Sequence, residues 1–346
     1  QFYKNKINPI TIAITGSSGK TTTKEMMASV MAEGYKIHKS PLNHNNEIGL
    51  CQTMLSMPED TEVLILEMGM RGLGEIELLS KYSTPDIAVI VNTGTAHIGR
   101  LGSVENIAKA KCEIASYLKP DGLLIAHDTP LIRSVNQYKG QTLYVGLESS
   151  DLSNIKLEQN SSRFTYKNKD YTINVEGLHN IQNALFVINA ALKLGLSEDK
   201  IAKGLEKYKP IEKRWELLDI AGYRVINDSY NSNPESLKAA ISTFLSTQKS
   251  PRCLVLGDMG ELGKDEAEYH KEIGEFLNKF EDLKLITVGP LAKYMTHGVK
   301  HEAKSFENSD GVAEFIKANV QKGSAILFKA SRFMKFEDII RELGEQ

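Results

Sequence analysis

The sequence predicts an α/β protein made of two doubly wound domains. Short apolar runs alternate with longer helical patterns along the chain, a glycine-rich turn follows the first apolar run, and the alternation starts again after Pro210. Apolar runs of about four to six residues between polar turns are typical of parallel strands that helices cover on both faces. A chain of 346 residues is long enough for two such domains.

The first domain is expected to span residues 1–210 and to be a central domain of the P-loop type. Its first strand is predicted at Ile10–Thr15, and the following helix, residues 22–33, should end at Gly34. Further strands are predicted at residues 63–68, 87–92, 123–126 and 143–145, and helices at residues 104–118 and 181–194. Residues 148–176 break this pattern, and their alternation predicts a small antiparallel hairpin as an appendage.

The second domain is expected to span residues 211–346 and to be a Rossmann-like α/β domain. Strands are predicted at residues 224–227, 253–257, 285–288 and 325–328, and helices at Pro234–Thr247 and at residues 265–279, 311–320 and 336–343. Pro234 suits the first turn of its helix, because the N–H that proline lacks has no partner there.

The composition excludes several classes of protein. A formal net charge of −2 gives neither a basic field for nucleic acid nor a polybasic patch for a membrane surface. No apolar run reaches the roughly 18 residues of a spanning helix, and the first residues do not resemble a secretory signal. The three cysteines are widely spaced, which argues against a disulfide scaffold or a zinc ribbon. We therefore expect a cytoplasmic monomer that acts on small molecules.

The strongest local signal is the glycine-rich segment between the first strand and its helix. It comprises Gly16, Ser17, Ser18, Gly19, Lys20, Thr21 and Thr22. Glycines let backbone amides surround a phosphate, Lys20 could reach the terminal phosphates of ATP, and Thr21 could bind Mg²⁺. The usual P-loop has about four residues between its glycines, whereas Gly16 and Gly19 enclose two. An ordinary turn that caps a helix remains the alternative.

Polar residues at the ends of predicted strands are further candidates, since doubly wound sheets place their ligands at that edge. Glu67 closes one strand, and His97 follows the next. Magnesium prefers oxygen ligands, so a metal role fits Glu67 better than His97. Glu67 could instead be a solvated carboxylate or a helix cap, and His97 could instead be a hydrogen-bonded loop histidine.

Three other polar segments could contact a nucleotide. Asn180 and Asn183 lie three residues apart and could bind a base edge, although Asn180 could equally cap the helix. The guanidinium of Arg214 could bind a polyphosphate or could lie on an ordinary surface. Residues 227–234 form a loop with more hydrogen-bonding groups than a helix cap needs.

Taken together, these segments resemble the Mur ligases, and within them the MurF branch. The matching stretches are residues 15–22, 43–49, 67–69, 92–97, 108–111, 177–183, 227–234 and 256–263. They occur in the order that the family shows and extend over nearly the whole chain. The resemblance implies an ADP-forming ligase that adds D-Ala-D-Ala to a UDP-MurNAc-tripeptide through an acyl phosphate, for peptidoglycan synthesis.

The resemblance also implies individual roles. Lys20 and Thr21 would serve ATP and Mg²⁺, and Glu67 and His97 would hold the metal. Adenine would contact Asn180 and Asn183, ribose would contact Asp228, and phosphates would contact Arg214. The substrates would contact Asn45, Asn46, Tyr230, Asn231 and Asn233. Lys111, as a carbamate, would hold a second Mg²⁺, since a carbamate offers oxygens where an ammonium would repel the cation. Lys24, one turn beyond Lys20, is expected to tolerate replacement.

Three departures from the family pattern qualify the resemblance. Leu42 and Ala330 occupy positions where relatives usually carry glycine, and the UDP-binding domain of relatives has no counterpart in residues 1–346. We therefore expect this chain to bind UDP poorly. A Mur-like ligase for another carboxylate, such as a folate or an amino-acid polymer, remains an alternative, as does an inactive nucleotide-binding scaffold.

Overall fold

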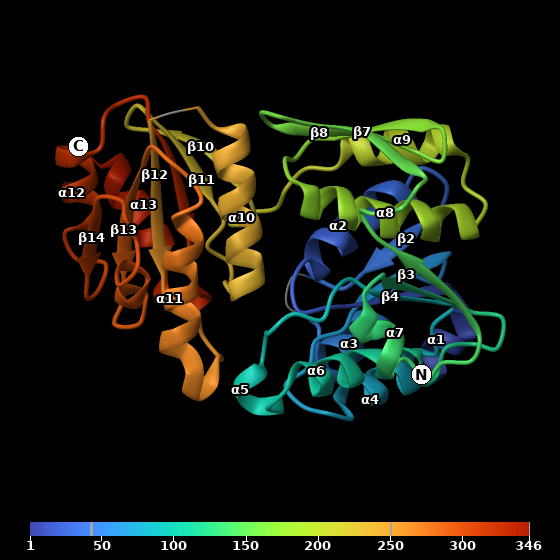
Figure 1. Ribbon diagram of the computed structural model, residues 1–346. Helices are drawn as coiled ribbons and strands as arrows, with labels where there is room; N and C mark the ends of the chain where they lie inside the picture. Colours follow the sequence, from blue (N-terminus) through green and yellow to red (C-terminus); the bar gives the residue numbers. More distant parts are fainter. Residues whose placement is uncertain (42–43, 250, 346) are drawn as a thin grey trace. The chain divides into compact units, whose positions relative to one another are not determined.

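The computed structural model describes residues 1–41, 44–249 and 251–345, so Leu42 lies outside the described residues. The chain forms two compact units, Gln1–Lys209 and Pro210–Gln346, which we call the N-terminal and C-terminal units (Figure 1). Within the described residues, no helix combines the length and the apolar character needed to cross a membrane.

The N-terminal unit is built on a parallel sheet whose described strands have the order β2-β3-β1-β4-β5-β6. The strands are β1 (Ile10–Thr15), β2 (Ile37–Lys39), β3 (Val63–Glu67), β4 (Ile87–Ile90), β5 (Leu123–His127) and β6 (Gln141–Val145). In the parallel register, Ile12 of β1 pairs with Ile65 on one side and with Ile87 on the other. Because the chain winds outward from β1 in both directions, the loop after β1 lies where a doubly wound sheet binds its ligand.

Helices cover both faces of this sheet, as the continuous apolar runs predicted (Figure 1). The helices are α1 (Phe2–Ile7), α2 (Lys20–Met31), α3 (Glu47–Leu55), α4 (Glu75–Ser83), α5 (Ile98–Leu101), α6 (Val104–Cys112), α7 (Pro130–Val135), α8 (Leu178–Lys193) and α9 (Glu198–Lys207). Apolar residues of α3, α4, α6 and α7 form one core cluster with alternate residues of the strands. Helix α2 packs against β1, β3 and α8, so it holds the glycine-rich loop on the sheet.

The predicted antiparallel appendage has three strands rather than two. They are β7 (Leu152–Glu158), β8 (Ser161–Tyr166) and β9 (Lys169–Ile173), in the order β7-β8-β9. β7 gave no sequence signal because most of its residues are exposed and its register shifts between Ser153 and Lys156. An exposed strand with a bulge lacks the alternation of apolar and polar residues on which the prediction rests.

The C-terminal unit contains a mixed sheet with the order β10-β11-β15-β12-β13-β14 in the described chain. Its elements are β10 (Glu216–Ile220), β11 (Tyr223–Asn227), α10 (Pro234–Thr247), β12 (Arg252–Gly257), α11 (Glu266–Leu277), β13 (Leu283–Val288), β14 (Ala303–Phe306), α12 (Val312–Asn319), β15 (Ala325–Lys329) and α13 (Phe336–Gly344). β10 runs antiparallel to β11, and the other pairs are parallel. The sequence did not predict the edge strands β10 and β14, because neither contains a buried residue.

Candidate functional site

The glycine-rich loop, residues 16–19, connects β1 to α2 in a conformation that needs its glycines. Gly19 has φ 76°, and a Cβ there would lie 3.0 Å from Oδ1 of Asn183 and 3.1 Å from Cγ1 of Val91. A Cβ on Gly16 would lie 3.0 Å from the Cβ of Val91. Lys20, the first residue of α2, donates a hydrogen bond from Nζ to the carbonyl oxygen of Gly16 at 2.7 Å. The lysine therefore bends back over the loop.

Asn92 fixes the shape of this loop from the end of the neighbouring strand. Its Oδ1 accepts hydrogen bonds from the amides of Ser17 and Ser18 at 2.9 and 3.0 Å. Its Nδ2 donates to Oγ of Ser18 at 2.9 Å and to the carbonyl oxygen of Ser18 at 3.2 Å. Sequence reasoning gave Asn92 no individual role, although the strand order that places β4 beside β1 explains its contact with the loop.

Thr21, Glu67 and Asn45 come together beside the loop. Oγ1 of Thr21 donates to Oε2 of Glu67 at 2.9 Å, and Nδ2 of Asn45 donates to Oε1 at 3.1 Å. Glu67 ends β3 and its side chain is 3% exposed. Carboxylate and hydroxyl oxygens are the ligand types that Mg²⁺ prefers. The described residues contain no group of three or more His, Cys, Asp or Glu side chains arranged for a metal.

Lys111 of α6 is buried, whereas Lys109 on the same helix is exposed. Burial lowers the pKa of Lys111 well below its usual value, and the charge of Lys20 lowers it further. His97 is the N-cap residue of α5, with φ 67°, and it is partly buried.

Lys24 does not fit the expectation that it can be replaced without effect. Its side chain is fully buried, and its Nζ lies 3.7 Å from Oε2 of Glu67. A buried ammonium beside a candidate metal ligand makes Lys24 unsuitable as a control for Lys20. Asn46 is the N-cap of α3 and accepts a hydrogen bond from the amide of Gly49 at 2.9 Å, so its side chain has a structural role.

Asn180 and Asn183 lie near the start of α8, and both are buried. Gly177 is the N-cap of this helix, so the alternative that Asn180 caps it is wrong. Nδ2 of Asn180 donates to the carbonyl oxygen of Glu176 at 2.7 Å, and Nδ2 of Asn183 lies 3.4 Å from Oδ1 of Asn180. Asn183 also packs against Gly19, which brings this amide pair to the glycine-rich loop.

The C-terminal unit contains a second group of candidate residues. Nζ of Lys329 donates to Oδ2 of Asp228 at 2.6 Å and to the carbonyl oxygen of Asn231 at 3.1 Å. The guanidinium of Arg214 lies 4.0 Å from the centre of the Tyr230 ring. Sequence reasoning assigned no role to Lys329, whose partner Asp228 lies about a hundred residues earlier in the chain. The contact arises because β11 and β15 are neighbours in the sheet.

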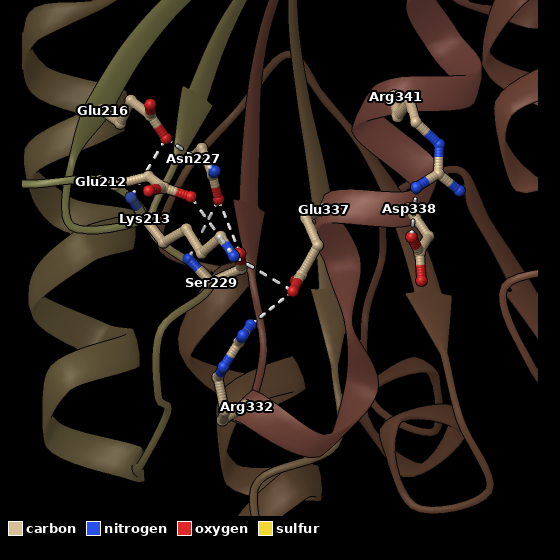
Figure 2. Close-up of polar contacts among 9 residues, drawn as sticks. All are labelled: Glu212, Lys213, Glu216, Asn227, Ser229, Arg332, Glu337, Asp338 and Arg341. Atoms are coloured by element: carbon tan, nitrogen blue, oxygen red, sulfur yellow. Dashed lines mark hydrogen bonds and ion pairs between the residues drawn. The ribbon is translucent and has the colours of Figure 1, made fainter. Parts of the chain in front are cut away.

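A polar network anchors the segment that carries Arg214 (Figure 2). Oε2 of Glu216 accepts from Nδ2 of Asn227 at 2.9 Å and from the amide of Lys213 at 3.1 Å. Nζ of Lys213 and NH1 of Arg332 both reach Oε1 of Glu337, at 3.1 and 2.5 Å. The network connects β10, β11 and α13 of the C-terminal unit. Asn233 of the following loop caps α10 through a capping box with Ser236.

The alanine that departs from the family pattern packs beside Gly257. Ala330 is fully buried, and an added Cβ on Gly257 would lie 2.7 Å from the Cβ of Ala330 and 2.7 Å from Cζ of Phe336. The absence of a side chain at Gly257 therefore makes room for the methyl group of Ala330.

The neighbouring loop after β12 is held by buried polar groups. Oδ1 of Asp258 accepts from the amides of Leu291 and Ala292 at 3.0 and 2.6 Å, and burial raises the pKa of its carboxyl group. His270 is fully buried, and its Nε2 accepts from the amide of Met259 at 2.9 Å. Burial lowers the pKa of His270, which keeps this nitrogen available as an acceptor.

A parallel sheet with a glycine-rich loop at its switch point, followed by a second α/β unit, defines the class of doubly wound proteins with a phosphate-type loop. Residues 14–191 match the family described as Mur ligase middle domain, and residues 213–332 match Mur ligase, glutamate ligase domain. The chain belongs to the Mur ligase family.

Particular relatives narrow the comparison. UDP-N-acetylmuramoyl-tripeptide--D-alanyl-D-alanine ligase of Bacillus subtilis (strain 168) is 40% identical over 354 residues, which cover 99% of this chain and 78% of that protein. MurF from Acinetobacter baumannii (crystal structure I) has a TM-score of 0.93 at 31% identity and covers 99% of this chain and 78% of that chain. MurF ligase from Thermotoga maritima in complex with ADP has a TM-score of 0.89 at 27% identity, and the match covers 99% of this chain and 82% of that chain. The fold is thus that of MurF.

Proposed function

We propose that the chain is an ATP-dependent, ADP-forming ligase that joins D-Ala-D-Ala to a UDP-MurNAc-tripeptide in peptidoglycan precursor synthesis. The observation that carries this proposal is the group Thr21, Glu67 and Asn45 beside the glycine-rich loop. It lies in a chain that is 40% identical to a relative named for this reaction. We expect the ligase to act on these small molecules as a monomer.

The N-terminal unit supplies the groups for the phosphates. The amides of Gly16, Ser17, Ser18 and Gly19, together with Lys20, Thr21 and Thr22, would surround the terminal phosphates of ATP. Thr21 and Glu67 would hold Mg²⁺ with phosphate oxygens, which fits their hydrogen-bonded oxygens in the structure. When bound, the ion withdraws charge from the γ-phosphate. Measuring whether Lys20→Ala still binds ATP would test the assignment of Lys20 to the phosphates directly.

The reaction proceeds by two substitutions. An oxygen of the tripeptide carboxylate attacks the γ-phosphorus and ADP leaves, with Lys20 stabilising the charge on the phosphoryl oxygens. The free amine of D-Ala-D-Ala then attacks the carbonyl carbon of the acyl phosphate. Phosphate leaves with the bonding electrons, the nitrogen loses a proton, and an amide remains. Asn45, which donates a hydrogen bond to Glu67, would lie beside the reacting carboxylate. The neighbouring Asn46 caps α3 and would hold this segment in place.

Each unit has further residues with a proposed binding role. In the C-terminal unit, Asp228, held by Lys329, would accept a hydrogen bond from a ribose hydroxyl. In the N-terminal unit, Asn180 and Asn183 would bind adenine. Arg214 would contact the phosphates, and its stacking on Tyr230 supports an ordered guanidinium. Substrate contacts are assigned to Tyr230, Asn231 and Asn233, the last of which also holds the loop through its cap.

Lys111 would carry a carbamate and, with His97, hold a second Mg²⁺. The neutral Nζ attacks the carbon of CO₂, a proton leaves, and a carboxylate-like group replaces the ammonium. Burial and the charge of Lys20 lower the pKa of Lys111, which raises the fraction of the neutral amine that this step needs. Mass spectrometry of the protein trapped under CO₂ would detect the added group.

Phosphate release with D-Ala-D-Ala and a panel of acyl substrates tests the proposed function. We expect turnover with a UDP-MurNAc-tripeptide, and turnover with a folate or an amino-acid polymer instead would establish the alternative ligase. Lys20→Ala should abolish turnover while the fold persists, because a lysine charge lost from a phosphoryl transition state typically costs several kcal/mol. The exposed Lys36, which pairs with Asp60, is the matched control.

A further inference from the structure

Lys24 occupies an unusual place for a lysine. It lies on α2, one turn beyond Thr21, and its side chain is fully buried. Its Nζ donates a hydrogen bond to the carbonyl oxygen of Ser40 at 2.9 Å. The same nitrogen lies 3.2 Å from Oε1 of Glu25 and 3.7 Å from Oε2 of Glu67. One buried ammonium thus faces two carboxylates.

The two carboxylates differ in their other partners. Glu25 also forms an ion pair with Lys39, whose side chain is 38% exposed. Glu67 is 3% exposed, and its carboxylate oxygens accept hydrogen bonds from the neutral groups of Thr21 and Asn45. A buried charge is costly unless an opposite charge compensates it. Lys24 supplies such a charge to Glu67.

The contacts of Lys24 also define the orientation of Glu67. Oε2 lies between the hydroxyl of Thr21 and the ammonium of Lys24, and Oε1 points to Asn45. The amide of Glu67 donates to Oγ of Ser40 at 3.2 Å, and Ser40 accepts from Lys24 through its carbonyl oxygen. The lysine therefore holds both the side chain and, through Ser40, the backbone of the end of β3.

We propose that Lys24 is a positioning residue that holds the Glu67 carboxylate in place for the cation of the nucleotide complex. The inference rests on the proposed function, in which Glu67 binds Mg²⁺. When the cation takes Glu67, Lys24 keeps Glu25 and Ser40 as partners, so it need not move. Without Lys24, Glu67 is a buried carboxylate without this ammonium beside it, and its orientation before the cation binds is no longer fixed.

A double-mutant cycle with Lys24→Met and Glu67→Gln tests the proposal on the full chain. Methionine is unbranched and apolar, so it fills the space of the lysine stem without its charge. We expect Lys24→Met to lower the folding equilibrium constant of the ligand-free protein at least 10-fold more in the wild-type background than in the Glu67→Gln background. A coupling of this size corresponds to about 1.4 kcal/mol.

Mg²⁺ binding gives a second readout that a merely structural lysine would not change. Calorimetric titration of Mg²⁺ into protein saturated with a non-hydrolysable ATP analogue should show at least 10-fold weaker binding for Lys24→Met. Lys39→Met is the matched control, because Lys39 contacts Glu25 and should give additive effects with Glu67→Gln and unchanged Mg²⁺ binding. Additive effects of Lys24→Met, with Mg²⁺ affinity within threefold of wild type, would overturn the proposal.

Two outcomes separate this proposal from the proposed function. Wild-type Mg²⁺ affinity in Glu67→Gln would refute Glu67 as a metal ligand, whereas the stability cycle would still measure the contact of Glu67 with Lys24.

If Lys24→Met does not fold, the folding of the double variant tests the proposal. A folded double variant supports the proposal, since removing the charge of Glu67 then removes the need for Lys24. A double variant that also fails to fold overturns it.

Discussion

Replacing Asn92 by alanine tests what keeps the glycine-rich loop in shape without a ligand. The side chain makes hydrogen bonds to two amides, one hydroxyl and one carbonyl oxygen of Ser17 and Ser18, at 2.9 to 3.2 Å. Neutral hydrogen bonds contribute about 1 kcal/mol each, and water would replace some of them. We therefore expect the local opening of the loop to become about 2–4 kcal/mol easier, which corresponds to roughly a 30- to 1,000-fold change.

Amide hydrogen exchange, measured by NMR or by mass spectrometry with residue resolution, is the assay. The two serine amides should respond differently. The amide of Ser17 also donates to the carbonyl oxygen of Asn92 at 3.2 Å, a bond that alanine preserves, whereas the amide of Ser18 donates to the Asn92 side chain. The exchange of the Ser18 amide should therefore accelerate by the full factor and that of Ser17 by less.

A control and a refuting result complete this experiment. Asn5→Ala removes an exposed asparagine side chain from α1 and should leave exchange in the loop unchanged. A change of less than threefold at the Ser18 amide in Asn92→Ala would refute the reasoning. Equal acceleration throughout the N-terminal unit would also refute it, because the effect would then be global unfolding rather than local opening.

Three further predictions concern other parts of the chain. Gly257→Ala should destabilise the C-terminal unit by about 1–3 kcal/mol through overpacking, and Ala330→Gly should recover part of this loss, as chemical denaturation would show. Burial lowers the pKa of His270 in the folded state, so the free energy of unfolding of this unit should fall as the pH falls through the usual range of histidine, where the unfolded chain binds more protons than the folded chain. Fluorescence of buried Trp215 would follow this, and His270→Gln should flatten it. Lys111→Ala should remove any stimulation of turnover by bicarbonate, and retention of that stimulation would exclude the carbamate.

The fold was predictable where burial imposes a clear pattern. β1 and α10 begin and end at the predicted residues, because one is a buried apolar run and the other has Pro234 at its first position. The strands β7, β10 and β14 contain no buried residue and carried no such pattern. Their positions depend on pairing with neighbours, which is a property of the folded chain rather than of the local sequence.

The candidate site was predictable in its residue types but less so in its contacts. Thr21 and Glu67 were assigned to one metal on separate grounds, and the structure joins their oxygens. Lys24 was expected to tolerate replacement and Lys329 was given no role, because lysine is usually an exposed residue and nothing local indicates that the folded chain will bury it. The sequence alone does not show whether Asn46 caps a helix or binds a substrate, since an asparagine side chain suits both roles.

The strand order has a consequence for synthesis of the protein on the ribosome. β1 is central, but its partners β3 and β4 come later in the chain, and Gly19 packs against Asn183 of a still later helix. The nascent chain therefore presents an apolar strand with two open edges until β3 has emerged, and with one open edge until β4 and Asn92 have emerged. Asn92 can shape the loop only from that moment, and the contact with Asn183 forms later still. The glycine-rich loop precedes all of these partners in the chain, and it is thus among the last features of its unit to be completed.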